Sequence, residues 1–251
     1  MAALTGIDSR TIWRIFLRTY LVGACFNTRG MQNIGLGLAM DPGLRALHSD
    51  PAELGRARRR ALKHYNSHPF FAPMLAGVFL SLEAAIARGE IKPKTLEEVK
   101  RTASYTLSAI GDSFFGGGLV PFWALSTVCL VASSNHAAAV VWGAGLVVAL
   151  QWFRFMGLVT GVRHGLGALP RLKRLNLINW GRRLKYANGL LIILLWAMLW
   201  RGEMVWWKWL LSCSLLGAAA WLVRRLGLPR EVVVLGLVAG YVLWPWMARM
   251  V

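Results

Sequence analysis

A carboxylate and a hydroxyl stand side by side in an otherwise apolar part of this sequence, at Asp112 and Ser113. An apolar approach ending at Gly111 precedes them, and two phenylalanines and three glycines follow. A carboxylate in apolar surroundings needs water or a polar partner, because otherwise its charge is strongly disfavoured. The glycines allow another backbone or a ligand to approach closely. The segment is therefore a candidate site, although its local pattern alone favours a helix cap after a break at Gly111.

A second group of polar side chains, Asn66-Ser67-His68, directly precedes Pro69. Proline biases the residue before it away from helical angles and is favoured as the first residue of a helix. The pattern therefore predicts that a helix begins at Pro69, where free backbone N–H groups lie beside these polar side chains. A single histidine at such a place is more often structural than a ligand. Glu83 would lie about 21 Å further along a straight helix, so we do not expect it to share a site with His68.

The sequence patterns exclude several kinds of chemistry. The sequence contains no glycine-rich phosphate loop ending in Lys-Ser/Thr, no Gly-x-Ser-x-Gly elbow and no paired His or Cys spacing suited to a metal. The 11 acidic residues are spread along the chain, which makes paired-carboxylate catalysis hard to place. We therefore expect no catalytic residue, no metal and no cofactor. A self-contained membrane enzyme is the weakest alternative, because no nucleophile–base set is visible.

The composition indicates a membrane protein with much positive charge. Of 251 residues, 56% are hydrophobic, the mean hydropathy is +0.48, and soluble domains are usually about 45–50% apolar. The formal charge is nevertheless +18, from 29 Lys and Arg against 11 Asp and Glu. Charged and apolar blocks alternate, which suits an integral membrane protein facing anionic headgroups. A nucleic-acid-binding domain would carry such charge on a mostly polar chain, so we expect no nucleic-acid partner.

Two basic amphipathic helices are predicted near the N-terminus, over residues 8–22 and 50–65. Such helices lie on a membrane surface or pack against a partner helix, and the pattern leaves both open. Asp50 and Pro51 suit the start of the second helix. Its basic side chains are expected to be exposed or to face headgroups: Arg56, Arg58, Arg59, Arg60 and Lys63.

A glycine-rich segment, 23–43, lies between these two helices. Its glycine density weakens a simple helix. If the segment is helical, Thr28, Gln32 and Gly35 share a face. Small and polar residues on one face allow a partner helix or a ligand to approach closely, and tight helix packing alone explains them equally well.

Apolar segments alternate with polar ones through the rest of the chain. Residues 69–88 form a mostly apolar run long enough to cross a bilayer. In the polar interval that follows, Thr95 and Glu98 fit a capping box, with Thr95 as N-cap. The runs 119–132 and 137–150 are each too short to cross alone, and they predict a hairpin of short helices or one helix with a polar break.

Residues 154–185 carry eight basic and no acidic side chains, which makes them the best candidate for a cytoplasmic segment. Three further apolar stretches follow, at 187–200, 204–223 and 231–248. Taken together, these patterns predict an all-α integral membrane protein with transmembrane helices, broken or re-entrant helices and amphipathic interfacial helices.

At five places the sequence resembles the IID component of the mannose/fructose/sorbose family of the bacterial sugar phosphotransferase system (PTS). The resemblance covers residues 10–167, and its most specific part is the pair Asn-Ser-His-Pro-Phe and Gly-Asp-Ser-Phe. The last third matches only as an apolar membrane region. The stretches that carry the resemblance are Ile15–Arg18 with Phe26-Asn27, Met31–Gly35 and Pro42; Tyr65–Phe70; Gly77–Glu83; Ile110–Gly116 with Pro121; and Arg154–Gly167.

The resemblance implies a multi-pass subunit of the bacterial inner (cytoplasmic) membrane that pairs with a homologous IIC subunit in a higher-order oligomer. The pair would carry a hexose or amino sugar by an elevator-like movement, while cytoplasmic IIA and IIB partners supply phosphate through phosphohistidines of their own. This chain would bind and position the sugar without carrying a phosphoryl group. Its polar side chains at matching positions are the candidate sugar-binding residues: Asn27, Gln32, Asn66, His68, Asp112 and Ser113.

One departure from the family pattern follows Asn27. The family usually shows an aromatic residue and then Glu-Arg, whereas this chain has Thr28, Arg29 and Gly30. A cation thus replaces a carboxylate. Two alternatives therefore stay open, a non-standard substrate and a structural or regulatory subunit that does not itself bind sugar.

We expect one IID-type membrane domain over residues 1–251. Its parts would be an amphipathic and glycine-rich N-terminal part at 1–65, a motif-bearing core at 66–167, and a basic loop with C-terminal membrane helices at 168–251. In a membrane domain, irregular backbone is tolerated where it lines a cavity or is buried in protein. The resemblance therefore favours a sugar-facing role for Asp112 and Ser113, which a helix start at the same place would not exclude.

Overall fold

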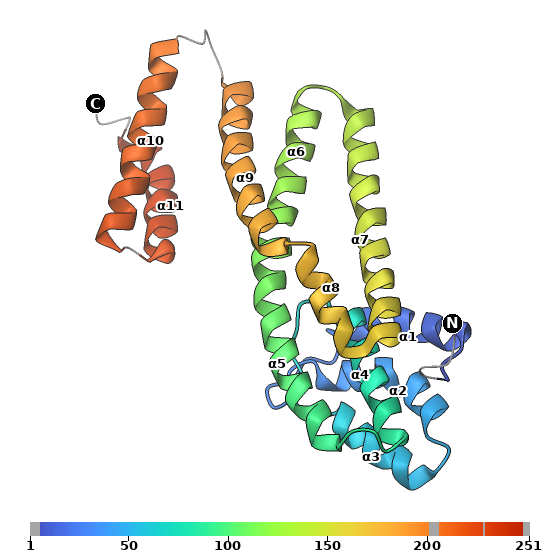
Figure 1. Ribbon diagram of the computed structural model, residues 1–251. Coiled ribbons are helices and arrows are strands. Elements are labelled where there is room, and N and C mark those ends of the chain that lie inside the picture. The colour runs from blue at the N-terminus through green and yellow to red at the C-terminus, as the bar shows by residue number, and fades with distance from the viewer. Residues whose placement is uncertain (1–5, 201–205, 228, 248–251) are drawn as a thin grey trace. The chain divides into compact units, whose positions relative to one another are not determined.

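The computed structural model of this chain describes residues 6–200, 206–227 and 229–247 (Figure 1). It separates into two compact units, Met1–Met198 and Leu199–Val251. The described residues contain helices and two isolated bridges but no β-strand. The α-helices are α1 (Ser9–Arg18), α2 (Asn33–Leu47), α3 (Pro51–Ala61), α4 (Ala72–Ala87), α5 (Pro93–Gly111), α6 (Val120–Ala132), α7 (His136–His164), α8 (Ala168–Arg174), α9 (Leu177–Leu199), α10 (Trp206–Leu226) and α11 (Arg230–Met247).

Helix α4 forms the core of the first unit. Most of its 16 residues are buried, including Phe79 and Leu80. A helix that is apolar on all sides is either buried in protein or in lipid, and here α2, α5 and α7 pack around it. The run 69–88 is long enough to cross a bilayer, but the helix within it is shorter than this run, and protein covers it.

Helices α4 and α7 touch through their backbones at two glycines. A Cβ on Gly77 would lie 2.5 Å from the carbonyl oxygen of Leu158, and a Cβ on Gly161 would overlap the carbonyl oxygen of Met74. Small residues allow such close crossings between helices. This contact joins α4 to the C-terminal part of the long α7 helix.

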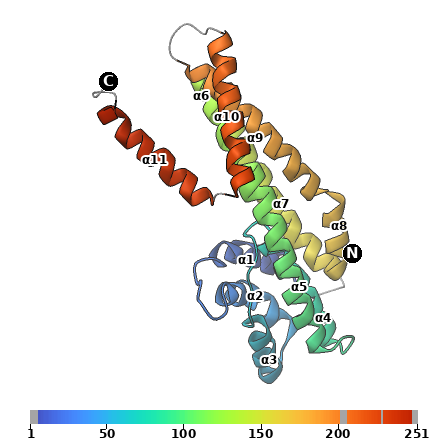
Figure 2. The same ribbon diagram turned by 90° about the vertical axis from the view of Figure 1, so that its left-hand side faces the viewer.

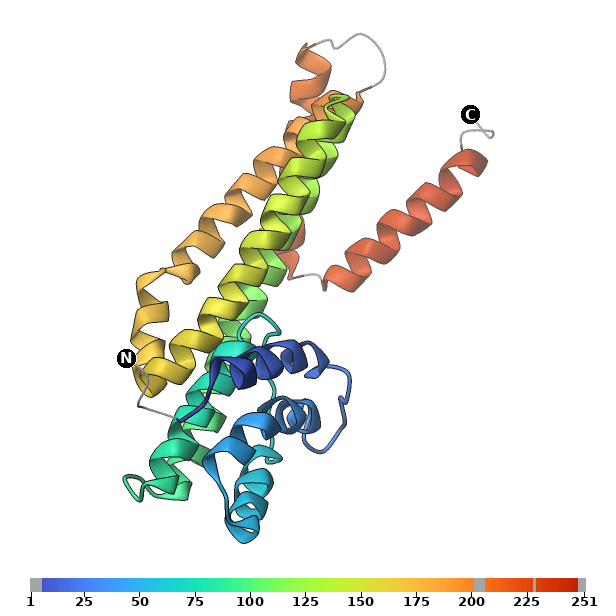
Figure 3. The ribbon, with the colours of Figure 1, turned by 90° about the vertical axis from the view of Figure 1, so that its right-hand side faces the viewer.

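Helices α1, α2 and α3 gather at one end of the long helices (Figure 3). Asp8 caps α1 by accepting a hydrogen bond from Thr11 N at 2.9 Å, and the helix buries Ile15 and Phe16 in the core. Its apolar face thus packs against α2. Of the two alternatives left open for this helix, packing against a partner helix is the one observed. The predicted start of α3 is confirmed: Pro51 is its first residue, and the Asp50 carboxylate accepts from Glu53 N at 2.9 Å.

The glycine-rich segment is helical only from Asn33 onward. Residues 22–32 form turns and a short bridge between Asn27 and Met31. The shared helical face predicted for Thr28, Gln32 and Gly35 is therefore absent. Gly35 instead packs on the backbone of Val22, where a Cβ would overlap main-chain atoms.

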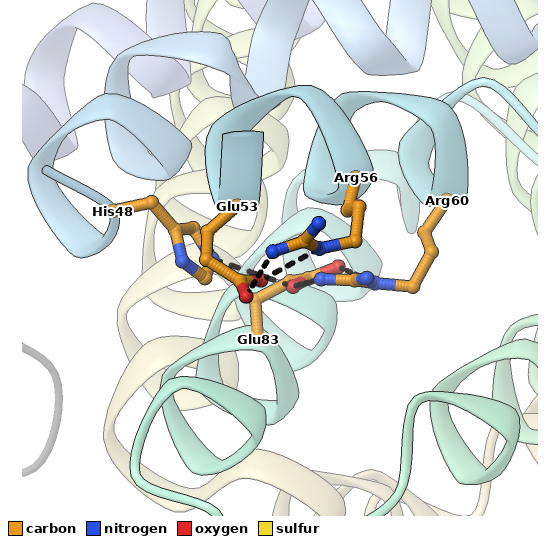
Figure 4. A network of polar contacts seen from close by, with 5 residues as sticks. All are labelled: His48, Glu53, Arg56, Arg60 and Glu83. Carbon is orange, nitrogen blue, oxygen red and sulfur yellow. Dashed lines mark hydrogen bonds and ion pairs between the residues drawn. The ribbon is translucent and has the colours of Figure 1, made fainter. Parts of the chain in front are cut away.

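A buried ion pair joins α3 to α4. Arg60 donates from Nε and Nη2 to the Glu83 carboxylate at 2.9 and 2.7 Å, and His48 Nε2 lies 3.6 Å from the same carboxylate (Figure 4). In Figure 4 the Glu53–Arg56 pair lies beside this cluster. The prediction that Arg60 is exposed is wrong, because a carboxylate on another helix neutralises it within the core.

The chain runs from α5 into α6 through an eight-residue π-helix, Asp112–Leu119, with no interruption (Figure 2). The break predicted at Gly111 is absent, and so is the helix cap there, since Asp112 makes no side-chain cap hydrogen bond. The predicted capping box is also wrong. Helix α5 begins at Pro93, because proline is favoured in the first turn. Thr95 therefore lies inside the helix, and its N donates to Lys92 O at 3.0 Å.

Helices α6 and α7 form the predicted hairpin, but its helices are long. Helix α6 extends α5, so that Pro93–Ala132 is one helical stretch of 40 residues, and α7 has 29 residues. The turn contains Ser134 at a positive φ of 58°. The expectation of short helices is wrong because each apolar run is only part of a longer helix.

The basic segment is helical rather than a loop. It comprises the last turns of α7, a reversal at Gly165 with a positive φ of 51°, helix α8 and the first half of α9. Glycine adopts this angle without the strain that a Cβ would add. Basic side chains are compatible with these helices because most of them are exposed, Arg171 and Lys173 among them.

Three helical stretches among the described residues are long and apolar enough to cross a membrane, which confirms the predicted fold class. They are Pro93–Ala132, His136–Leu199 and Trp206–Leu226. The second unit consists of α10 and α11 in its described part. Residues 204–205 and 248 of the predicted apolar stretches lie outside the described residues.

Candidate functional site

The two polar motifs meet where His68 packs on Gly111. A Cβ on Gly111 would overlap the Cβ and Cγ of His68, so glycine is needed for this approach. The His68 ring stacks on Phe115, with ring centroids 5.1 Å apart and planes inclined by 16°. The structure thus brings His68 and the helical residues Gly111 and Asp112 together, although they are far apart in the sequence.

His68 lies in a turn and not at a helix start. Its carbonyl oxygen accepts hydrogen bonds from Phe71 N at 2.9 Å and Ala72 N at 3.2 Å, and α4 begins at Ala72. The predicted start at Pro69 is therefore three residues too early. The site consists of side chains from a turn and a π-helix, not of free helix N–H groups.

Burial and charge act on the His68 imidazole in opposite directions. Burial lowers the pKa of His68 below its ordinary value, and the nearby Asp112 carboxylate offsets part of that effect. Phe70 N donates to His68 Nδ1 at 3.4 Å, which leaves the proton of the neutral ring on Nε2. His68 is therefore a neutral hydrogen-bond donor at neutral pH.

Asp112 and Ser113 are both exposed on the π-helix. Lys185 Nζ on α9 donates to Ser113 Oγ at 3.2 Å. Within the described part of the chain, the Asp112 side chain makes no hydrogen bond or ion pair. Its carboxylate is thus available to a ligand. Lys185 is a site residue that sequence reasoning missed, because only its place in a basic segment marked it.

Helix α9 packs closely on the π-helix through small residues. A Cβ on Gly181 would contact Phe114 Cα at 3.5 Å, and Asn188 Nδ2 donates to Gly118 O at 3.0 Å. In a π-helix the backbone hydrogen bonds join residues five apart instead of four, so the carbonyl groups have different partners from those in an α-helix. Asn188 satisfies one of these carbonyl groups, that of Gly118. This packing places Lys185 beside Ser113.

Aromatic rings surround Phe115 on the inner side of the site. Four rings lie around the Phe115 ring with centroid distances of 4.6 to 5.6 Å: Phe70, Phe71, Phe114 and Phe153. Phe115 is almost completely buried, whereas Phe70 and Phe114 are half-buried. We call these five phenylalanines the aromatic cluster; it offers apolar surface beside His68 and Asp112.

Asn66 and Gln32 lie in or against the same turn. Asn66 is half-buried, and its side-chain amide makes no hydrogen bond to any described residue. Gln32 is bonded to the turn: its backbone N donates to Tyr65 O at 2.8 Å, and its Oε1 accepts from Ser67 N at 3.2 Å. Gln32 therefore positions the turn that carries Asn66 and His68.

Asn27 is used within its own loop. Its Oδ1 accepts from Gly30 N at 2.8 Å and Arg29 N at 3.2 Å, and its Nδ2 donates to Asn33 Oδ1 at 2.9 Å. The structure does not bring this side chain into contact with His68 or Asp112. Asn27 thus stabilises the loop that precedes α2.

A small cleft of about 140 Å³ lies next to the turn, and the buried Arg154 of α7 lines it together with Gln32 and Pro69. The guanidinium stacks 3.8 Å from the Tyr20 ring centroid and donates from Nη2 to Thr19 Oγ1 at 3.3 Å. Its Nε is buried without a hydrogen-bond partner among the described residues. A buried guanidinium with unused donors favours an oxygen-rich ligand or water.

The described residues contain no group of three or more His, Cys, Asp or Glu side chains that could hold a metal. The long apolar helices, with polar groups enclosed between them, define an all-helical integral membrane protein. Residues 6–200 match the family described as "PTS system mannose/fructose/sorbose family IID component". The chain belongs to this family.

Two curated relatives agree with this assignment. The mannose-specific EIID component of Escherichia coli (strain K12) is 34% identical over 123 residues, which are 48% of this chain and 42% of the relative. The fructose permease IID component of Bacillus subtilis (strain 168) is 24% identical over 66% of this chain and 61% of its own length. The chain thus matches less than half the length of the E. coli relative.

Two solved structures share the fold. The structure of the mannose transporter ManYZ with microcin E492 has a chain that is 22% identical, with a TM-score of 0.58 over 94% of this chain and 97% of that chain. A second, described as the structure of a membrane protein, is also 22% identical, with a TM-score of 0.69 over 95% and 97%. At this identity the likeness concerns the fold alone.

Proposed function

We propose that this chain is the IID subunit of a mannose-family sugar permease and forms, with a IIC partner subunit, the unit that binds a sugar and carries it across the bacterial inner membrane. Cytoplasmic IIA and IIB partners would couple this movement to phosphorylation of the sugar. One observation carries the proposal: a neutral imidazole, His68, and an unpaired carboxylate, Asp112, meet beside the aromatic cluster. Such a combination suits a hydroxyl-rich ring.

Each polar group has a distinct role in this proposal. The Asp112 carboxylate accepts hydrogen bonds from sugar hydroxyls, and the His68 Nε2–H donates one. The Asn66 amide can do both, and Ser113 presents a hydroxyl that Lys185 already orients. The exposed parts of the aromatic cluster face the apolar side of the sugar ring. Gln32 and Asn27 act as positioning residues, since their own hydrogen bonds hold the neighbouring loops.

The test is uptake and phosphorylation of labelled hexoses in cells that carry IIA, IIB, IIC and this chain. Asp112→Asn removes the charge at nearly constant volume. We expect roughly a ten- to hundredfold rise in the KM for uptake, because a hydrogen bond to a charged group contributes about 1.5–3 kcal/mol. Glu98→Gln, an exposed carboxylate on α5, is the matched control.

The outcome that counts against this site is unchanged uptake. If Asp112→Asn and Asn66→Ala both transport normally at equal amounts in the membrane, the sugar-binding assignment of this turn is wrong. Loss of transport in Glu98→Gln as well would indicate a general effect on the complex.

A second candidate function is a structural or regulatory subunit that does not touch the sugar. It is supported by Asn27, whose hydrogen bonds are all used within its own loop, and by Arg29 at the position where the family has a carboxylate. In that case a variant with Asn66→Ala, His68→Phe and Asp112→Asn combined would still transport when the IIC partner is present. Transport lost in this variant, with the complex still assembled, argues against it.

We also propose that the basic residues 154–185 face the cytoplasm, that the complex is a higher-order oligomer, and that residues 1–251 act as one IID-type membrane domain. The absence of acidic residues in 154–185 supports the orientation. A single cysteine at Arg174, in a variant without the three native cysteines, should react with an impermeant thiol reagent only from the cytoplasmic side. Reaction from the outside alone would reverse the orientation.

A further inference from the structure

A groove with apolar walls is lined by α5 and by the segment formed by α8 and the start of α9. Its volume is about 630 Å³, within the range of roughly 300–1,000 Å³ that is usual for small-molecule sites. Apolar side chains provide most of its surface. They include Leu107, Ile110, Leu166, Leu169, Leu172 and Ile178.

The groove follows the first uncharged part of α5. This helix begins with a charged section, 94–101, and then carries no charged residue until Asp112. The lining residues on α5 fall between Val99 and Ile110. The exposed Trp180 on α9 has the Arg183 guanidinium 5.0 Å from its ring centroid. Tryptophan is typical of the boundary between membrane and water, which favours a position of the groove at this boundary.

One cation, Lys173, lines the groove, and Arg171 and Arg174 are close to it in the sequence of α8. All three residues are exposed. They make no hydrogen bond or ion pair through their side chains within the described residues. On α5, Glu97 is paired with Lys63 and Glu98 with Lys94. Among the described residues no carboxylate is paired with the three cations of α8, which leaves them available to an anionic ligand.

We propose that this groove, which we call the α5–α8 groove, binds a phospholipid with an anionic headgroup. The phosphate would contact Lys173 and its basic neighbours, and the acyl chains would cover the apolar walls. One molecule thus supplies both a negative charge for Lys173 and apolar chains that cover the walls of the groove. Basic pockets between membrane helices on the cytoplasmic side bind anionic lipid headgroups in this way. The inference does not depend on the sugar site.

The test uses the purified full chain in nanodiscs of phosphatidylcholine with and without phosphatidylglycerol. We expect phosphatidylglycerol to raise the unfolding temperature by about 4 °C or more, because a ligand bound only to the folded state stabilises it. We also expect retained phosphatidylglycerol in native mass spectra. Lys173→Glu with Arg174→Glu should abolish both effects. Thr106→Trp, which fills the groove from an exposed position on α5, should remove the bound lipid without changing the charge.

Arg10→Glu with Arg14→Glu is the matched control, because it reverses two exposed charges on α1. This variant should keep the response to phosphatidylglycerol. Equal stabilisation by both lipids overturns the proposal, and so does an equal loss in the control, which would indicate general charge attraction. Inorganic phosphate that stabilises the protein as well as phosphatidylglycerol would reduce the groove to an anion site. Loss of IIC association in Thr106→Trp, with unchanged lipid retention, would show a protein interface instead.

Discussion

At the scale of single residues, the candidate site depends on the absence of a side chain at Gly111. A Cβ there would overlap the His68 side chain close to its backbone, where it has little freedom to move. We expect Gly111→Ala to displace the turn of His68 and to cost about 1–3 kcal/mol of stability, as overpacked core positions do. Thermal unfolding in detergent measures the cost, and sugar uptake measures the displacement.

Gly116 provides the control for this substitution. It lies in the same π-helix, and a Cβ there would meet no atom within 4 Å. Gly116→Ala should therefore leave stability unchanged or raise it slightly, because alanine loses less backbone entropy than glycine. Equal effects of the two substitutions would contradict the packing of His68 on Gly111.

The protonation of His68 should affect stability below neutral pH. Its pKa in the folded state is lowered by burial from 6.5, so between the two pKa values the unfolded chain binds more protons. This contribution to stability is complete above pH 6.5 and is lost as the pH falls through the folded-state pKa. The measurement is the unfolding temperature as a function of pH between about 5 and 8.

Two substitutions separate His68 from the other titrating groups. His68→Gln and His68→Phe both remove the titration, and His68→Phe also keeps a ring to stack on Phe115. Both should make the unfolding temperature less dependent on pH in this range. If the dependence persists in both variants, another group causes it.

At the scale of secondary-structure elements, the Arg60–Glu83 pair holds α3 against α4. Both side chains are almost completely buried, and Lys100 Nζ holds the end of α3 through hydrogen bonds to Ala61 O at 2.6 Å and Lys63 O at 2.8 Å. Glu83→Gln leaves the Arg60 charge unpaired. We expect a loss of about 3–5 kcal/mol, because removal of one partner of a buried pair costs this much.

The exposed pair Arg88–Glu90 is the control for the buried one. Glu90→Gln should change the unfolding temperature little, since water screens exposed ion pairs. A double variant, Glu83→Leu with Arg60→Met, should be more stable than Glu83→Gln, because it leaves no unpaired charge. A Glu83→Gln protein as stable as the Glu90→Gln protein would show that the pair contributes little.

Elements defined by local signals were predictable, and those defined by distant contacts were not. Asp50 and Pro51 mark the start of α3 because the cap is formed within one turn. Arg60 was predicted to be exposed, since nothing near it in the sequence indicates that Glu83, 23 positions away, neutralises it. The local pattern favoured a break at Gly111, but packing against α9 through Asn188 supports a continuous helix there.

At the scale of the whole molecule, composition and hydropathy were sufficient to predict the helical membrane class. They could not decide whether α4 crosses the bilayer, because an apolar run of this kind has the same composition in a protein core as in a bilayer. Sequence motifs identified His68 and Asp112 as candidates, and the fold brings them together. Lys185 was missed since its contact with Ser113 joins residues 72 positions apart.

The two compact units predict that the first folds without the second. Met1–Met198 contains the whole hydrophobic core and the candidate site, and the family match ends at residue 200. A compact unit with its own core can fold alone. A chain ending at residue 200 should therefore keep its unfolding temperature within a few degrees of that of the full chain, which is roughly the shift that a change of 1 kcal/mol in stability causes. It should also keep the destabilisation by Glu83→Gln. Circular dichroism during heating in detergent measures both, and a broad, non-cooperative transition in the shortened chain would show that α10 and α11 are needed for the fold.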